Sequence, residues 1–153
     1  MVSKLYRKIL IATDGSEYTK KAVDYGIDIA DNTGAKLHVI YVVDTTSYGS
    51  IPLSALMEYA YSILRQEGDM AIKYVTDRAE AAGLEAEGII AEGHPADEII
   101  KYAEKNSIDL IVMGTLGKSG LDRFLLGSVA DKVIRNSRIP VIAVPVKDKK
   151  IER

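Results

Sequence analysis

Short apolar runs alternate along this chain with longer segments that repeat apolar residues at helical spacing. The runs occupy residues 8–13, 37–43, 84–92, 110–113 and 140–146. Runs that are almost continuously apolar are typical of strands covered on both faces, as in parallel sheets. Each intervening segment is long enough for a right-handed crossover. The alternation therefore predicts an open α/β sheet with helices on both faces, with the more polar run 84–92 nearer an edge.

Four helices are expected between these runs. The first follows a turn at 14–17 and closes at Gly34, a residue that often ends helices. The third begins near Pro95, and the fourth extends from about Ser128 to Asn136 with Val129, Val133 and Ile134 facing inward. The second is long and interrupted by Gly68, and its predicted buried face comprises Leu56, Ala60, Ile63, Leu64, Ala71, Val75 and Ala79.

Composition limits the classes of protein to which the chain can belong. Its 153 residues predict a single domain over 1–153, and its net charge of −2 provides no general basic field for nucleic acid. The absence of cysteine excludes disulfides, thiolate metal sites and cysteine nucleophiles. No apolar run approaches the roughly 20 residues that span a bilayer, and no signal peptide is visible. A cytoplasmic protein without membrane partners is expected.

Glycines follow the fourth apolar run in a pattern that suggests a phosphate site. The run stops at Gly114, a loop containing Gly117 and Gly120 follows, and Gly127 precedes the fourth helix. Glycines allow close backbone approach, and the N–H groups of a helix start favour an anion. The loop amides expected to hold phosphate are those of Gly117, Lys118 and Ser119, completed by Ser128 and Val129.

A carboxylate is expected opposite this loop. The first strand ends in Thr13-Asp14-Gly15, and ligands of open α/β sheets bind beyond strand ends where the strand order reverses. If the first and fourth strands are neighbours, Asp14 faces the glycine loop. Local explanations also exist, because Asp14 could serve its own turn, Ser128 could be a simple N-cap, and the glycines could be turn residues. The combination of strand, glycine loop and helix favours the phosphate hypothesis.

The spacing Gly114-x₂-Gly117-x₉-Gly127-Ser128 resembles the nucleotide motif of the universal stress protein family. Its flanks agree, with similar segments at 9–16, 93–99, 126–133 and 139–145, so the resemblance covers essentially the whole chain. It implies a Rossmann-like, five-stranded parallel sheet in the order 3-2-1-4-5. It also implies binding of ATP, with Mg²⁺ or Mn²⁺ as the metal and Asp14 as a possible metal ligand beside the phosphates.

The resemblance assigns site residues by position. On the adenosine side these are Ala12, Thr13, Asp14 and Val42, the last through its backbone to adenine. Toward the ribose and phosphates they are Met113, Gly114, Leu116, Gly117, Gly127, Ser128, Val129 and Ala130. The sequence departs from the family pattern where Leu116 replaces a frequent Arg or His, Ala130 a frequent Ser or Thr, and Ala12 an occasional Pro.

The last apolar run predicts a homodimer. At a sheet edge, Val141, Ile142, Ala143 and Val144 would form an unprotected template for strand pairing. Pairing with a second copy across a two-fold axis would cover it, and the family resemblance also suggests such dimers. The alternative is that a loop or the C-terminal tail covers the edge.

Four functions compete at this point. The favoured hypothesis is a non-enzymatic, ATP-binding regulator or sensor that acts in stress response as a homodimer with a protein partner; "stress" comes from the family name alone. A slow metal-dependent ATPase or other ATP-using enzyme is the alternative, although no catalytic residue stands out and the loop lacks the G-K-[S/T] ending of a P-loop. An interaction module with an empty pocket is disfavoured by the glycine spacing. A phosphoacceptor receiver domain is disfavoured because Asp14 has no second acid beside it.

Overall fold

The computed structural model describes residues 3–46, 55–117 and 126–146, which form a parallel sheet flanked by helices. Its strands follow the order β3-β2-β1-β4-β5, which confirms the predicted fold class and the neighbouring positions of the first and fourth strands. The elements in chain order are β1 (Lys8–Ala12), α1 (Glu17–Thr33), β2 (Lys36–Asp44), α2 (Ala55–Ala81), β3 (Ala86–Gly93), α3 (Pro95–Lys105), β4 (Leu110–Gly114), α4 (Ser128–Asn136) and β5 (Val141–Val144).

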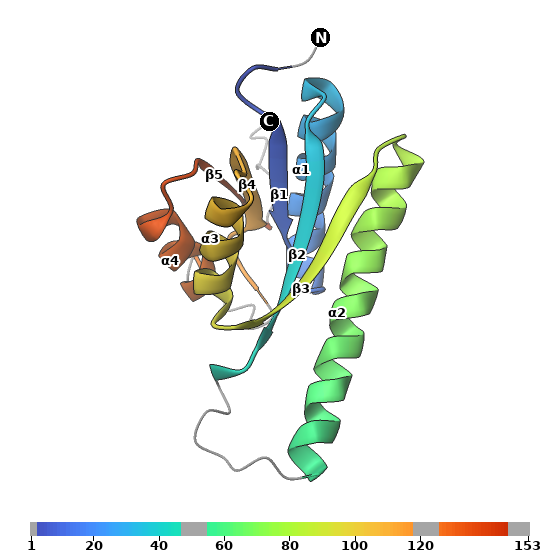
Figure 1. Ribbon diagram of the computed structural model, residues 1–153, viewed down its shortest axis with the longest axis vertical. Helices are drawn as coiled ribbons and strands as arrows, with labels where there is room; N and C mark the ends of the chain where they lie inside the picture. The colour runs from blue at the N-terminus through green and yellow to red at the C-terminus, as the bar shows by residue number, and fades with distance from the viewer. Residues whose placement is uncertain (1–2, 47–54, 118–125, 147–153) are drawn as a thin grey trace, which may run out of the picture.

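Helices cover both faces of the sheet (Figure 1), and each face has its own hydrophobic core. Ile9 and Ile11 of β1 pack under α1 and α2, whereas Leu10 packs on the opposite face under α3 and α4. All three side chains are fully buried. Successive side chains of a strand point to opposite faces, so a central strand with both faces covered must be apolar at every position. This requirement explains the continuous apolar runs.

The N-terminal half of α2 differs from its sequence prediction. Leu56 and Ile63 were expected on the buried face, but they are 75% and 40% exposed. The buried residues of α2 begin only at Gly68 and continue through Ala71 to Ala79. Figure 1 gives the reason, because the first half of α2 extends beyond the end of the sheet and has no strand to cover. Helical periodicity identifies an apolar face but not the surface on which it rests.

Two details of α4 also correct the sequence prediction. Gly127, not Ser128, is the N-cap, and Ser128 is the first helical residue. Ile134 was expected to face inward, but it is 42% exposed. The short helix buries only Ala130 and Val133, and its remaining residues, Ile134 among them, are partly or largely exposed.

Candidate functional site

The strand order brings the carboxyl ends of three neighbouring strands, β2, β1 and β4, together at one end of the sheet. β1 lies between β2 and β4, and Ile11 of β1 pairs with Val112 of β4. The segment after β1 therefore emerges beside Gly114, the last residue of β4. A cavity of about 350 Å³ opens at this end, within the roughly 300–1,000 Å³ typical of small-molecule sites. This is the place where open α/β sheets bind ligands.

Most of the residues assigned from the sequence line this one cavity. They are Ala12, Thr13, Asp14, Val42, Met113, Gly114, Leu116, Gly117, Gly127, Ser128, Val129 and Ala130. Two others, Lys118 and Ser119, lie outside the described residues. The structure thus brings together residues from β1, β2, β4 and α4 that are far apart in the chain. Their roles toward a ligand stay predictions.

Asp14 serves its own turn and also faces the glycine loop. Its Oδ1 accepts hydrogen bonds from the Ser16 backbone N–H at 2.9 Å and from the Ser16 hydroxyl at 2.6 Å. Its Oδ2 points toward Gly117, where a Cβ would lie only 2.8 Å away. The local turn role is therefore real, but it involves one carboxylate oxygen and leaves the carboxylate directed across the cavity.

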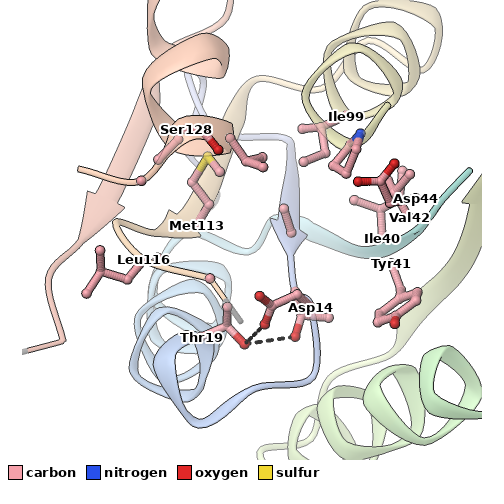
Figure 2. A pocket seen from close by; sticks show the side chains of 18 of the residues that line it. Asp14, Thr19, Ile40, Tyr41, Val42, Asp44, Ile99, Met113, Leu116 and Ser128 are labelled. Atoms are coloured by element: carbon pink, nitrogen blue, oxygen red, sulfur yellow. Dashed lines mark hydrogen bonds between the residues drawn. The ribbon is translucent and has the colours of Figure 1, made fainter. Parts of the chain in front are cut away.

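Two buried threonines hold this turn in place. The hydroxyls of Thr13 and Thr19 lie 3.1 Å apart, and the Gly15 N–H donates to Thr13 Oγ1 at 3.1 Å. The Thr19 hydroxyl also donates to Asp14 Oδ1 at 3.4 Å. Figure 2 marks hydrogen bonds of Thr19 with dashed lines. Because these bonds connect the start of α1 to the end of β1, the Asp14 side chain is oriented before any ligand arrives.

The glycines of the loop occupy places where larger residues would not fit. A Cβ at Gly114 would lie 2.9 Å from the Tyr18 carbonyl oxygen, and one at Gly127 would lie 3.0 Å from the Thr115 carbonyl oxygen. The Gly127 N–H also donates to that Thr115 oxygen. The hydrogen bond between Gly127 and Thr115 therefore joins the two ends of the glycine loop beside the cavity.

The first turn of α4 borders the same cavity through Ser128, Val129 and Ala130. The first N–H groups of an α-helix have no partner within the helix, and the helix dipole places partial positive charge there. The described lining contains no His, Lys or Arg. In the described part of the site, backbone N–H groups and side-chain hydroxyls such as that of Ser128, rather than cationic side chains, are therefore the donors that face an anion.

The opposite end of the cavity is mainly apolar, and most of its residues were missed from the sequence. The unassigned lining residues are Thr19, Ile40, Tyr41, Asp44, Leu64, Pro95, Ile99 and Thr115. Asp44 could have been found, because it ends a strand next to Asp14's strand. Leu64 and Ile99 could not, because their position depends on how α2 and α3 pack on the sheet. Figure 2 shows Ser128 and Met113 on one side and Val42, Asp44 and Ile99 on the other.

The carboxylates of the site do not form a metal cluster by themselves. Among the described residues, no group of three or more His, Cys, Asp or Glu side chains could hold a metal ion. Asp14 stands at the glycine loop and Asp44 at the end of β2. Mg²⁺ is commonly held by one or two carboxylates together with substrate phosphates, so Asp14 suits a metal that arrives with a nucleotide.

The model of the universal stress protein family matches residues 5–145 of this chain. The chain belongs to the universal stress protein family. The universal stress protein MJ0531 of Methanocaldococcus jannaschii is 45% identical over 140 residues, which cover 92% of this chain and 82% of that protein. At this identity and coverage, the family relationship extends over nearly the whole chain and confirms the sequence resemblance.

Solved structures of universal stress proteins have the same fold. Protein MJ0577 of the same organism superimposes with a TM-score of 0.83 at 30% identity, covering 95% of this chain and 99% of that one. A universal stress protein in complex with cAMP superimposes with a TM-score of 0.71 at 28% identity, covering 94% and 100%. In the part of this chain that the structure describes, no helix has the length and apolar character needed to cross a bilayer.

Proposed function

We propose that this universal stress protein binds ATP in the cavity at the ends of β1, β2 and β4. The observation that carries the proposal is the closed glycine loop, with Gly114, Gly117 and Gly127 all lying against the cavity. A Cβ at any of them would come within 3.0 Å of a neighbouring oxygen. Such a cradle leaves space for phosphate groups while it presents backbone N–H groups to them.

The two ends of the cavity differ in chemical character, and this difference orients the nucleotide. The phosphates lie at the α4 end, where Gly127 and Ser128 present the helix N-terminus. The base lies at the β2 end, where Val42 and Ile99 provide an apolar wall and the Val42 backbone can bond the adenine edge. Asp14 lies between the two ends (Figure 2) and accepts hydrogen bonds from ribose hydroxyls or binds a divalent cation carried by the phosphates. The related protein in complex with cAMP supports an adenine nucleotide.

The described lining suits binding better than rapid hydrolysis. General base catalysis needs a side chain within hydrogen-bond reach of the attacking water and a pKa suited to that task. Asp14 is the one described carboxylate at the glycine loop, and its Oδ1 already accepts from Ser16. We therefore assign the protein a regulatory or sensory role in which ATP occupancy is communicated to a protein partner. The cytoplasmic location and the role in stress response stay predictions.

We also propose that the protein is a homodimer paired through β5. This strand is the last of the sheet, next to β4 alone. The carbonyl oxygens of Pro140 and Val144 accept hydrogen bonds from the N–H groups of Ile111 in β4 and of Thr115 just after it. Backbone groups alternate in direction along a strand, so the N–H and C=O of the intervening Ala143 face away from β4. They are available to a second β5 strand across a two-fold axis.

Analysis of the purified protein tests the ATP proposal. The protein is denatured, and the released small molecules are separated and identified by mass spectrometry. An adenine nucleotide present at close to one equivalent per chain in the wild-type protein, and strongly depleted in a Gly127→Ala variant, is the expected result. Protein that releases no nucleotide, and produces no calorimetric heat when ATP and Mg²⁺ are added, would refute the proposal.

A further inference from the structure

Several exposed apolar side chains of α2 take no part in lining the ATP cavity. Tyr59 and Met70 are 65% and 72% exposed, and Leu56 and Ile63 are exposed as well. We propose that this face of α2 is the docking surface for the protein partner, and that the partner binds it with an amphipathic helix whose flanks are basic. This inference rests on the proposed regulatory function and names the surface that the partner contacts.

The spacing of these residues places them on one face of the helix, which we call the α2 stripe. Successive members are three, four, seven and four positions apart: Leu56, Tyr59, Ile63, Met70 and Tyr74. At 3.6 residues per turn, these positions fall within about 60° of arc. The buried residues of α2 occupy a different arc. Apolar residues repeated in this way are the pattern by which one helix packs along another.

The α2 stripe continues into a groove between α1 and α2. A cavity of about 420 Å³ there is bordered by Met70 and Tyr74 of the stripe and by Val23 of α1. The first half of α2 extends past the end of the sheet, as Figure 1 shows. A partner helix can therefore lie along α2 with one end in the groove. Recognition of a helix in a groove uses apolar anchors at such spacings.

The groove and the ATP cavity share a wall. Thr13, Asp14 and Thr19 border both spaces. A partner seated in the groove therefore lies against the same turn that faces the glycine loop on its other side. Ile134 of α4 is also an exposed apolar residue, but it borders neither space. The position of the α2 stripe thus suits a partner that responds to ATP occupancy better than the surface around Ile134 does.

The charges of α2 favour a basic partner. All three basic side chains of the helix are in ion pairs with acids of this chain, whereas Glu58 and Asp69 have no ion-pair partner among the residues that the structure describes. Both of these acids are exposed, and Asp69 directly precedes Met70 of the stripe. Unpaired acids beside an apolar face attract basic side chains and repel acidic ones. The ion pairs are Arg65–Glu92, Lys73–Asp77 and Arg78–Asp24.

Two synthetic peptides test the proposal on nucleotide-free, full-length protein. Both are amphipathic helices of three heptads with leucine at the a and d positions; one carries lysine at e and g, and the other carries glutamate there. Each peptide is fluorescently labelled and titrated with the protein, and binding is followed by fluorescence anisotropy. The lysine peptide should bind the wild-type protein at least about tenfold more tightly than the glutamate peptide.

Variants with matched controls locate the binding surface. The double variant Ile63→Gln/Met70→Gln removes two apolar contacts from exposed positions without a change of charge, and it should weaken binding of the lysine peptide at least about tenfold. Ile134→Gln makes the same kind of change on α4 and should bind the peptide as the wild type does.

A second pair of variants tests the contribution of charge. Asp69→Asn should narrow the difference in affinity between the lysine and glutamate peptides, because it removes one of the unpaired acids beside the stripe. Asp28→Asn, at an exposed position of α1, removes an equal charge and should leave that difference unchanged.

Lysine-peptide binding that is absent in the wild type, or that the double variant leaves within about twofold, overturns the inference. Equal affinity for the two peptides also overturns it. So does a mass above two chains in light scattering, or co-sedimentation with phosphatidylglycerol vesicles, if the double variant abolishes it, because a second copy or a lipid surface would then occupy the stripe. A wild-type protein that binds the lysine peptide but no ATP overturns the proposed ATP function and leaves the docking surface in place.

Discussion

The carboxylate of Asp14 lies against Gly117, with Oδ2 only 2.8 Å from the position that a Cβ at residue 117 would occupy. The two residues belong to segments that follow β1 and β4, and the pairing of those strands brings them together. This contact places a carboxylate at a glycine loop that ends at a helix N-terminus. The predictions below follow from this arrangement and from the packing that supports it.

Gly117→Ala should remove ATP binding while the protein stays folded. The added methyl group would contact Asp14 Oδ2 and occupy space that the ligand needs. We expect the calorimetric affinity for ATP to fall by at least about tenfold, which corresponds to roughly 1.4 kcal/mol. Gly83→Ala is the matched control, because its positive φ of 78° makes Ala unfavourable although no atom lies within 4 Å. That variant should lose about 1 kcal/mol of stability and keep its ATP affinity; equal affinity losses in both variants would contradict the account.

Gly68→Ala should destabilise the protein, although alanine favours helices over glycine by about 1 kcal/mol. Gly68 is buried in α2 against the ring of Tyr41, and a Cβ there would lie 2.7 Å from the ring. Tyr41 is 3% exposed and lines the cavity, so a shift of its ring would disturb the packing of the cavity wall. We expect the free energy of unfolding to fall by roughly 1–3 kcal/mol in urea titrations. Gln66→Ala on the exposed side of α2 should cause little change, and a stabilised Gly68→Ala would show that the packing is looser than described.

Ala143→Pro should convert a dimer to a monomer. Proline removes the N–H of Ala143, which faces away from β4, and leaves the β4-facing groups of Pro140 and Val144 intact. Light scattering should show the mass of two chains for the wild type and of one chain for the variant. Ile134→Lys is the control for a different surface, because Ile134 is exposed on α4. It should stay dimeric; a monomeric wild type, or a dimer that survives Ala143→Pro but not Ile134→Lys, would place the interface elsewhere.

His38 should make stability depend on pH. Burial lowers its pKa, the carboxylate of Glu87 opposes that effect, and the ammonium groups of Lys8 and Lys36 add to it. Its Nδ1 lies 2.7 Å from the Tyr102 hydroxyl. A histidine with a lowered folded-state pKa is protonated more readily in the unfolded chain, so its contribution is complete above about pH 6.5 and is lost as the pH falls below that value.

A His38→Gln variant measures that contribution. Glutamine can bond the Tyr102 hydroxyl but does not titrate. Urea midpoints determined between about pH 7.5 and pH 5.5 should fall more steeply for the wild-type protein than for His38→Gln. Parallel profiles would show that His38 does not titrate differently in the folded and unfolded states.

Local signals explain which parts of the fold could be predicted. The continuous apolar run at 8–13 identified a central strand because both faces of β1 are covered. Gly34 marked the end of α1, where the structure shows a left-handed C-cap with φ of 73°. The glycine spacing and Asp14 marked the cavity because strand ends at a reversal of strand order meet in space. Each of these predictions depends on a rule that acts within a few residues or within one sheet.

The remaining parts depend on packing that no local pattern contains. Leu56 and Leu64 have the same apolar character, yet Leu56 is exposed and Leu64 lines the cavity. The difference arises because α2 is longer than the sheet beneath it. Ile99 likewise lines the cavity only because of the way α3 packs on the sheet. Such residues are set by the lengths and angles of elements, which hydrophobic periodicity does not encode.

Calorimetric titration of nucleotide-free protein with ATP in the presence of Mg²⁺ tests the central claim most directly. The account predicts binding of one ATP per chain, strongly weakened by Gly127→Ala, whose Cβ would lie 3.0 Å from the Thr115 carbonyl oxygen. The Gly83→Ala control should bind as the wild type does. Absence of heat with the wild-type protein, or binding that Gly127→Ala leaves unchanged, would contradict an ATP site in the cavity between Asp14 and α4.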